Sequence, residues 1–159
     1  HGLGLETTAL SCMLLAYGVG NTMGTFVAGS VLHRSFRNTM IGIHIIPALT
    51  AVLLFFFTGQ IAVSLPLLLV WGFMFGMLCV GWTAWIALTL ADKAEIAGGL
   101  SVAAIQFSIG MAAGLGGNLY DATGMRGIFL TAAVILTGAV LLTLAEFQLY
   151  FRSTGKKLD

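Results

Sequence analysis

Three long stretches of the chain contain no lysine, arginine, aspartate or glutamate. The longest covers the 54 residues between Arg37 and Asp92, and two shorter stretches cover residues 7–32 and 96–120. About 20 consecutive apolar residues cross the roughly 30 Å hydrocarbon layer of a bilayer as a helix. A charge at mid-depth costs on the order of 3 kcal/mol on insertion scales. The pattern therefore predicts a protein that crosses the membrane several times.

Turn-forming residues and charges divide the chain into five apolar spans. Within the longest charge-free stretch we expect a break at Thr58, Gly59 and Gln60, with Pro66 in the first turn of the next helix. The spans are too long and too uniformly apolar for β-barrel strands, which alternate over about ten residues. The sequence predicts an all-α polytopic membrane protein with five transmembrane helices, near residues 7–32, 38–57, 65–90, 96–119 and 127–151, and a tail over residues 152–159.

The few cations are distributed unequally between the two sides of the membrane. With five spans, successive loops alternate sides, so six cations share one side and only Arg126 lies on the other. Cytoplasmic loops carry an excess of lysine and arginine, which predicts that the C-terminus is cytoplasmic and that the segment with Glu6 lies on the opposite side. The six cations are Arg34, Arg37, Lys93, Arg152, Lys156 and Lys157.

Composition agrees with a membrane protein and argues against several other classes. Hydrophobic residues make up 58% and charged residues 8%, against about 25% charged in soluble domains. The net charge of +1 without a basic stripe argues against nucleic-acid binding. Cysteine and histidine spacings match no metal site, and no GxSxG, HExxH or phosphate-loop motif of an enzyme is present. The expected surroundings are therefore a lipid bilayer.

Small residues recur at four-residue spacing on three of the five spans. Such stripes allow helix backbones to approach closely in lipid, so they predict a tightly packed bundle. Static packing and a role in helix sliding both remain open. The stripes are Gly20-xxx-Gly24-xxx-Ala28, Gly72-xxx-Gly76, and Gly110-xxx-Gly114 beside Ala113-xxx-Gly117.

Polar side chains deep in the spans are few. Tyr17 and Asn21 lie one turn apart in the first span, and Gln106 lies near the middle of the fourth. Each can hydrogen-bond a neutral polar solute without the cost of burying a charge. Hydrogen bonding between helices is the alternative. These three residues are therefore candidates for either a solute site or interhelical contacts.

A stripe of bulky side chains follows helical spacing along the third span. Met74 and Trp82 are its candidate cavity-lining members, although the same stripe is also suited to face lipid. Trp71 and Trp85, near the span ends, fit the aromatic belts of membrane interfaces. The stripe consists of Trp71, Met74, Phe75, Leu78, Trp82 and Trp85.

Two titratable residues lie within spans. His44 is the only deep histidine and could carry a proton, but a local hydrogen bond is favoured because its span contains no carboxylate. Glu146 lies near the cytoplasmic end of the last span, where we expect it to reach the interface or to pair with Arg152. Neither residue predicts a proton-coupling site on its own.

The loop between the first two spans resembles the signature of the major facilitator superfamily, G-x-L-a-D-R-x-G-R-R. Gly29, Arg34 and Arg37 match the signature, whereas His33 replaces its aspartate and Phe36 replaces its second glycine. This pattern is similar to the weaker copy found after the eighth helix in that superfamily. The replacement argues against an aspartate-based gating latch in this half.

The fourth span extends this resemblance. Residues 97–100, 104–110 and 114–121 are similar to helix eleven of the drug:proton antiporter branch, especially its arabinose-efflux-like and purine-nucleoside-efflux-like members, and residues 80–85 also resemble the latter. The resemblance covers nearly the whole chain and implies helices eight to twelve, with helix seven and the N-terminal half missing. The start at His1, without basic residues before the first span, also predicts an internal or C-terminal piece.

The resemblance implies a function. It predicts proton-coupled efflux of a small organic solute, such as a nucleoside, sugar or drug, by alternating access across a bacterial inner membrane. A proton gradient rather than a bound cofactor would drive transport, and the missing N-terminal half would be the partner. Gly29, Arg34 and Arg37 would form a cytoplasmic gating loop, and the solute would contact Tyr17, Asn21, Met74, Trp82, Gln106 and Phe107. The alternative is a small five-helix scaffold or pore subunit that oligomerises through its glycine stripes.

Overall fold

The computed structural model describes the backbone of residues 2–154 and the side chains of residues 7–150. Within that part of the chain every regular element is helical: α1 (Gly2–Arg34), α2 (Phe36–Phe56), α3 (Ile61–Thr89) and α4 (Ala94–Thr154), with a short 3₁₀ turn at Ala91–Lys93. All four α-helices are long and apolar enough to cross a membrane. The predicted all-α architecture is confirmed. The tail beyond residue 154, with Lys156 and Lys157, lies outside the described residues, as does the side chain of Arg152.

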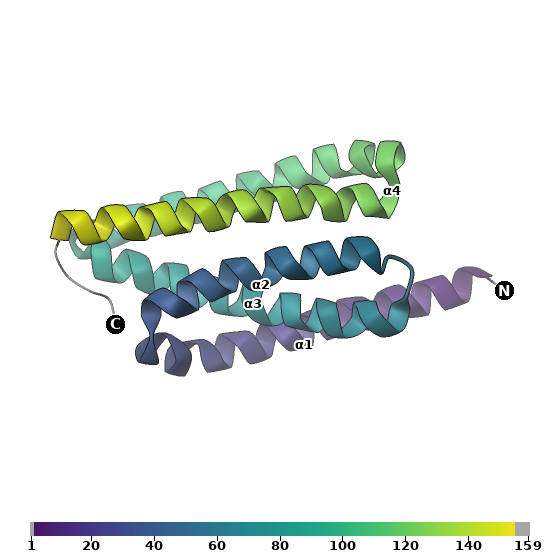
Figure 1. The fold of residues 1–159 in the computed structure, drawn as a ribbon, viewed down its shortest axis with the longest axis horizontal. Helices are drawn as coiled ribbons and strands as arrows, with labels where there is room; N and C mark the ends of the chain where they lie inside the picture. Colours follow the sequence, from purple (N-terminus) through teal and green to yellow (C-terminus); the bar gives the residue numbers. More distant parts are fainter. Residues whose placement is uncertain (1, 155–159) are drawn as a thin grey trace.

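The structure has four long helices where the sequence predicted five. The difference lies in α4, whose 61 residues would extend about 92 Å if straight, three times the thickness of the hydrocarbon layer. The helix reverses direction at Gly124, and its two arms run in opposite directions along the bundle (Figure 1). The spans predicted near 96–119 and 127–151 are these two arms, joined without the polar loop that we expected between them.

A single glycine, Gly124, allows α4 to reverse direction without a loop. Gly124 has φ 67° and ψ −170°, a conformation that is essentially restricted to glycine. Thr123 donates a hydrogen bond from Oγ1 to the carbonyl of Leu119 at 2.7 Å, which places its side chain where a Cβ on Gly127 would lie. Helical structure therefore continues up to the reversal and resumes immediately after it.

The other boundaries follow the expected signals with one shift. The break predicted at Thr58, Gly59 and Gln60 is confirmed, and Gly59 has a positive φ of 93°. However, α3 begins at Ile61, so Pro66 lies in its second turn rather than in its first. Ser35 alone separates α1 from α2, with φ −160° and ψ 86°.

The helices form a bundle in which neighbours in space are not neighbours in sequence. The most extensive packing joins α1 to α3 and α2 to α4, while α1 and α4 make no contact within the described residues. Figure 1 shows the α1–α2 and α3–α4 junctions at one end of the bundle, and the α2–α3 turn and the reversal of α4 at the other. Arg34, Arg37 and Lys93 therefore share one end, and Arg126 lies at the opposite end.

Glycine brings α1 and α3 into backbone contact. A Cβ on Gly20 or Gly24 would overlap the backbone of Leu69 or Phe73, and the glycines of α3 are equally close to α1. The close packing predicted for the first and third spans is therefore confirmed. The glycine stripe of the fourth span packs closely against no other helix of the described chain. No atom lies within 4 Å of a Cβ built on Gly110, Gly114 or Gly117.

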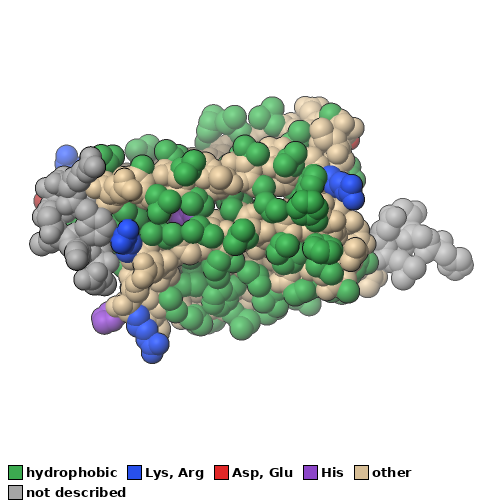
Figure 2. All heavy atoms as spheres, in the orientation of Figure 1, with side chains coloured by type: hydrophobic (Ala, Val, Ile, Leu, Met, Phe, Trp, Pro, Cys, Tyr) green, Lys and Arg blue, Asp and Glu red, His purple; other side chains and the backbone are tan. Residues whose placement is uncertain are grey.

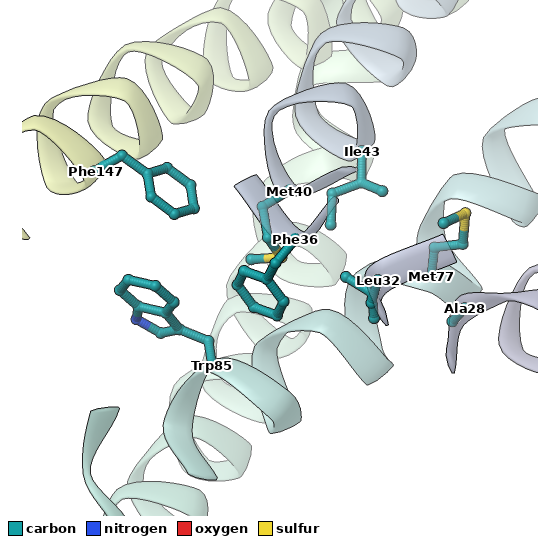
Figure 3. Close-up of a cluster of buried hydrophobic side chains, with 8 residues drawn as sticks. All are labelled: Ala28, Leu32, Phe36, Met40, Ile43, Met77, Trp85 and Phe147. Atoms are coloured by element: carbon teal, nitrogen blue, oxygen red, sulfur yellow. The ribbon is translucent and has the colours of Figure 1, made fainter. Parts of the chain in front are cut away.

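A hydrophobic core lies toward the end of the bundle that contains the α1–α2 junction, and it draws on all four helices (Figure 3). Trp85 is 7% exposed and stacks on Phe36 with ring centroids 5.9 Å apart. Phe147 and Tyr150 of α4 each lie 5.2 Å from the same ring. The assignment of Trp85 to an interfacial belt was therefore wrong. Buried members of the core are Ala28, Leu32, Phe36, Met40, Ile43, Met77, Trp85 and Phe147.

The outward surface of the bundle is apolar. Phe26 is 84% exposed and Leu142 is 73% exposed, and Figure 2 shows hydrophobic side chains covering the middle of the molecule, with cations at the ends. Serine and threonine hydroxyls within the helices donate to carbonyls one turn back, as Thr50 does to Ile46 at 2.8 Å, so they do not require water. The chain is a multi-pass membrane protein.

Candidate solute-binding site

Tyr17 and Asn21 lie beside the crossing of α1 and α3. A Cβ on Gly72 would overlap the carbonyl of Tyr17, and a Cβ on Gly76 would overlap the carbonyl of Asn21. The missing side chains at Gly72 and Gly76 thus allow the two half-buried polar residues to approach α3 directly. The structure brings this pair together as the sequence predicted.

The side chain of Asn21 occupies space that a larger residue on α3 would take. Its Oδ1 atom lies only 2.8 Å from the position of a Cβ on Gly76. The backbone carbonyl of Asn21 accepts a hydrogen bond from Thr25 Oγ1 at 3.0 Å. The backbone of Asn21 is therefore held within the crossing, and its amide side chain is directed toward Gly76.

Phe75 belongs to this site, although sequence reasoning did not select it. Its ring centroid is 6.2 Å from that of Tyr17, with the two rings tilted by 43°. Both rings are partly exposed, which leaves aromatic surface available for contact. Trp82 lies seven residues further along α3, on the same helix face. The sequence did place Phe75 in the stripe of bulky residues on the third span. Only the packing of α1 on α3 shows that Phe75, among the members of that stripe, contacts Tyr17.

Met74 lies in a different place, in a groove of about 360 Å³ between α1, α2 and α3. We call it the α1–α2–α3 groove. Asn38 and Thr39 form its polar end. Its apolar lining comes from Val31, Ile43, Ile46, Phe73, Met74 and Met77, with Gly42 between them.

Trp82 contacts His44 rather than Tyr17. The two rings meet edge to face, with centroids 6.3 Å apart and an interplanar angle of 89°. His44 is buried, and its Nδ1 atom makes a 2.8 Å hydrogen bond with the carbonyl of Met40 one turn back in α2. The local hydrogen bond predicted for His44 is confirmed.

Gln106 and Phe107 lie on the first arm of α4, where both side chains are exposed. Because α1 and α4 make no contact within the described residues, the structure does not join this pair to Tyr17 and Asn21. The six predicted contact residues therefore occupy four places: the α1–α3 face, the groove, the contact of Trp82 with α2, and the first arm of α4. Their roles in binding a solute stay a prediction.

The loop that resembles the superfamily signature is divided between surface and core. Gly29, Arg34 and Arg37 are exposed, as is His33 at the position of the signature's aspartate. Phe36, which replaces the second glycine, is buried against Trp85. This departure from the signature therefore has a packing role. No three histidine, cysteine, aspartate or glutamate side chains in the described part of the chain lie together as a metal site would require.

Glu146 has a partner that the sequence did not suggest. Its Oε1 atom accepts a 3.1 Å hydrogen bond from Nε1 of Trp85, which links the second arm of α4 to α3. The expected pairing with Arg152 falls on a side chain outside the described residues. The carboxylate therefore contributes to packing at this end of the bundle.

Comparison with known proteins gives relatives at moderate identity. The chain is 38% identical over 141 residues to a protein of Pseudomonas aeruginosa named transcription regulatory protein OpdE. It is 32% identical over 142 residues to the purine ribonucleoside efflux pump NepI of Escherichia coli strain K12, and equally to NepI of strain O157:H7. No family model and no solved structure matches. The matches cover 89% of this chain but only 35% of each relative, so the chain is homologous to about a third of a purine ribonucleoside efflux pump.

Proposed function

We propose that this chain forms helices eight to twelve of a major facilitator transporter that exports a small organic solute by alternating access. The observation that carries this proposal is the 32% identity to an efflux pump over 89% of the chain. The helical architecture supports it, since four long apolar helices, one of them folded into two arms, supply the five spans required. The 38% identity to a protein named as a transcription regulator does not favour a second function, because this chain has a net charge of only +1 and no basic stripe for DNA.

We propose a nucleoside as the first solute to test, ahead of sugars and drugs. The name of NepI supports this class. The α1–α3 face supports it as well, because the aromatic rings of Tyr17 and Phe75 suit a flat base and the amide of Asn21 suits its polar edge. Gln106 and Phe107 would complete the site from α4. Met74 and Trp82 are also proposed to contact the solute, which would reach them from the side of α3 that faces α2.

Asn21→Ala and Gln106→Ala are expected to weaken transport in the full-length protein. Each variant removes one neutral hydrogen bond, worth about 0.5–1.5 kcal/mol, so the apparent KM for the exported solute should rise roughly 2- to 12-fold. The measurement is export of a panel of nucleosides, sugars and drugs from cells that carry the complete gene. Thr22→Ala and Ser108→Ala are matched controls, because these exposed hydroxyls already bond to Gly18 and Ala104. Unchanged apparent affinity of both amide variants for every exported solute would refute the site.

We propose that proton coupling lies outside α2 and α3, the two helices between Arg37 and Asp92. Between Arg37 and Asp92 His44 is the only titratable group other than Cys79, and its Nδ1 atom is occupied by the carbonyl of Met40. We expect His44→Gln to keep efflux dependent on an imposed proton gradient, with a rate within about 5-fold of wild type, because a local hydrogen bond contributes only on the order of 1 kcal/mol. His33→Gln, on the exposed loop, is the control. Loss of gradient dependence in a folded His44→Gln protein, with normal dependence in the control, would place the proton site in α2.

The orientation of the chain is also part of the proposal. Three cations of the described chain, Arg34, Arg37 and Lys93, share one end of the bundle, and Arg126 is at the other. The excess supports a cytoplasmic position for the α1–α2 junction and for the C-terminus, in a bacterial inner membrane. Gly29, Arg34 and Arg37 would then lie where a cytoplasmic gate closes against the N-terminal half of the transporter.

A further inference from the structure

The α1–α2–α3 groove is graded in polarity along the direction in which the helices cross the membrane. Asn38 and Thr39 lie at its end near the α1–α2 junction, while Ile46 and Phe73 lie deeper. From Asn38 to Ile46 the groove follows α2 for eight residues, or about 12 Å. This length falls within one leaflet of a hydrocarbon layer roughly 30 Å thick.

The missing side chain of Gly42 keeps the groove open. A Cβ built on Gly42 would meet no atom within 4 Å, so the space beside it is not filled by other parts of the described chain. The groove also borders surface that is suited to lipid, since Leu49, one turn beyond Ile46 on α2, is 59% exposed. An acyl chain could therefore enter from the bilayer without displacing protein.

A cation lies beyond the polar end of the groove. Arg34 is one turn after Val31, which lines the groove from α1, and residues three apart share a helix face. The guanidinium is exposed at the helix end, where it can reach a phosphate at the membrane surface. We propose that the groove binds one anionic phospholipid, with an acyl chain against Gly42 and Met74 and the headgroup phosphate at Arg34. The proposal rests on the groove and not on the transport function, in which Arg34 is also a candidate gate residue.

Lipid retention tests this proposal on the purified full-length protein. Native mass spectrometry after exposure to phosphatidylglycerol or phosphatidylcholine should show phosphatidylglycerol retained at least about 5-fold better. Both lipids offer a phosphate to Arg34, but only phosphatidylcholine also carries a cation that Arg34 repels, and one unit of charge at a membrane surface is worth an advantage of that order. Arg34→Gln should remove the preference. Gly42→Leu should lower retention of both lipids at least about 5-fold, because its side chain fills the groove. Gly138→Leu is the control, since its Cβ also meets no atom within 4 Å but lies in α4.

Each outcome decides the proposal. Equal retention of the two lipids by the wild type, or unchanged phosphatidylglycerol retention in Gly42→Leu, would overturn it. A Gly42→Leu protein that loses thermal stability in lipid-free detergent and retains lipid normally would show that another protein segment fills the groove, which also overturns it. If Gly42→Leu does not fold, the loss of preference in Arg34→Gln decides, and a preserved preference would refute the headgroup site.

Discussion

Gly24→Ala is expected to separate α1 from α3 and to remove most of the folded protein from the membrane. The new Cβ would overlap the carbonyl oxygen of Phe73 and lie 2.8 Å from its carbonyl carbon. A backbone cannot turn aside as a side chain can, so the helices must move apart along the whole crossing. Overpacking typically costs about 1–3 kcal/mol and occasionally more, and a forced backbone shift places this variant at the upper end. Thermal unfolding and the yield of monodisperse full-length protein measure the effect.

Gly18→Ala is the matched control on the same helix. Gly18 is exposed, and no atom lies within 4 Å of its Cβ position, so the same chemical change should leave the free energy of unfolding unchanged or raise it by up to about 1 kcal/mol through helix propensity. The comparison separates helix propensity from contact between helices. A Gly24→Ala protein as stable as Gly18→Ala would show that α1 and α3 do not cross as closely as described.

The second large effect is expected at Trp85, where rings of α2 and α4 meet α3. Trp85→Ala removes the ring that Phe36, Phe147 and Tyr150 pack against, and it leaves a cavity where α2, α3 and α4 meet. Truncation of a buried tryptophan costs about 3–5 kcal/mol, so we expect a large fall in the unfolding temperature. Thermal unfolding of the full-length protein, followed by circular dichroism, would measure it.

Two further variants divide the contribution of Trp85 into its parts. Trp85→Phe keeps an aromatic ring but loses the Nε1 donor to Glu146, whereas Glu146→Gln keeps a carbonyl acceptor for that donor. We expect Glu146→Gln to lie within about 1 kcal/mol of wild type and Trp85→Phe to fall between wild type and Trp85→Ala. If Glu146→Gln were as damaging as Trp85→Ala, the charge of the carboxylate rather than the ring packing would stabilise this end of the bundle.

Features that depend on local composition could be predicted from the sequence. The charge-free stretches identified the spans, and Gly59 in its polar setting identified the turn after α2. The four-residue glycine spacing in the first and third spans identified the faces that meet, because only small residues permit that approach in lipid. The same spacing at Gly110 and Gly114 found no partner in the described chain, since spacing indicates a capacity to pack but not which helix supplies the other surface.

Features that depend on packing between distant segments could not be predicted. Trp85 lies near a span end, which favours an interfacial position, and only the approach of Phe36 and Phe147 from α2 and α4 shows that it is buried. From the sequence, Phe36 was only a departure from the second glycine of the signature, whereas in the structure it is a buried core residue. The reversal near Gly124 was expected between the fourth and fifth spans, but the polar residues around it suggested a loop where one glycine makes the turn.

The candidate site was predicted only in part for the same reason. Tyr17 and Asn21 share one helix, so their proximity follows from their spacing alone. Grouping them with Met74 or Gln106 required knowing how α1, α3 and α4 are placed, and the structure separates these residues. Phe75 could be found only through its contact with Tyr17.

The crossing of α1 and α3 also has a consequence for biosynthesis. Gly24 meets Phe73, a residue synthesised 49 positions later, and α2 must be made in between. At about 5–20 residues per second, the glycine face of α1 waits roughly 2 to 10 seconds for its partner while the chain is being inserted. During that interval its backbone faces lipid or the insertion machinery. The order of synthesis therefore exposes the most closely fitted surface of the bundle before the helix that covers it has been made.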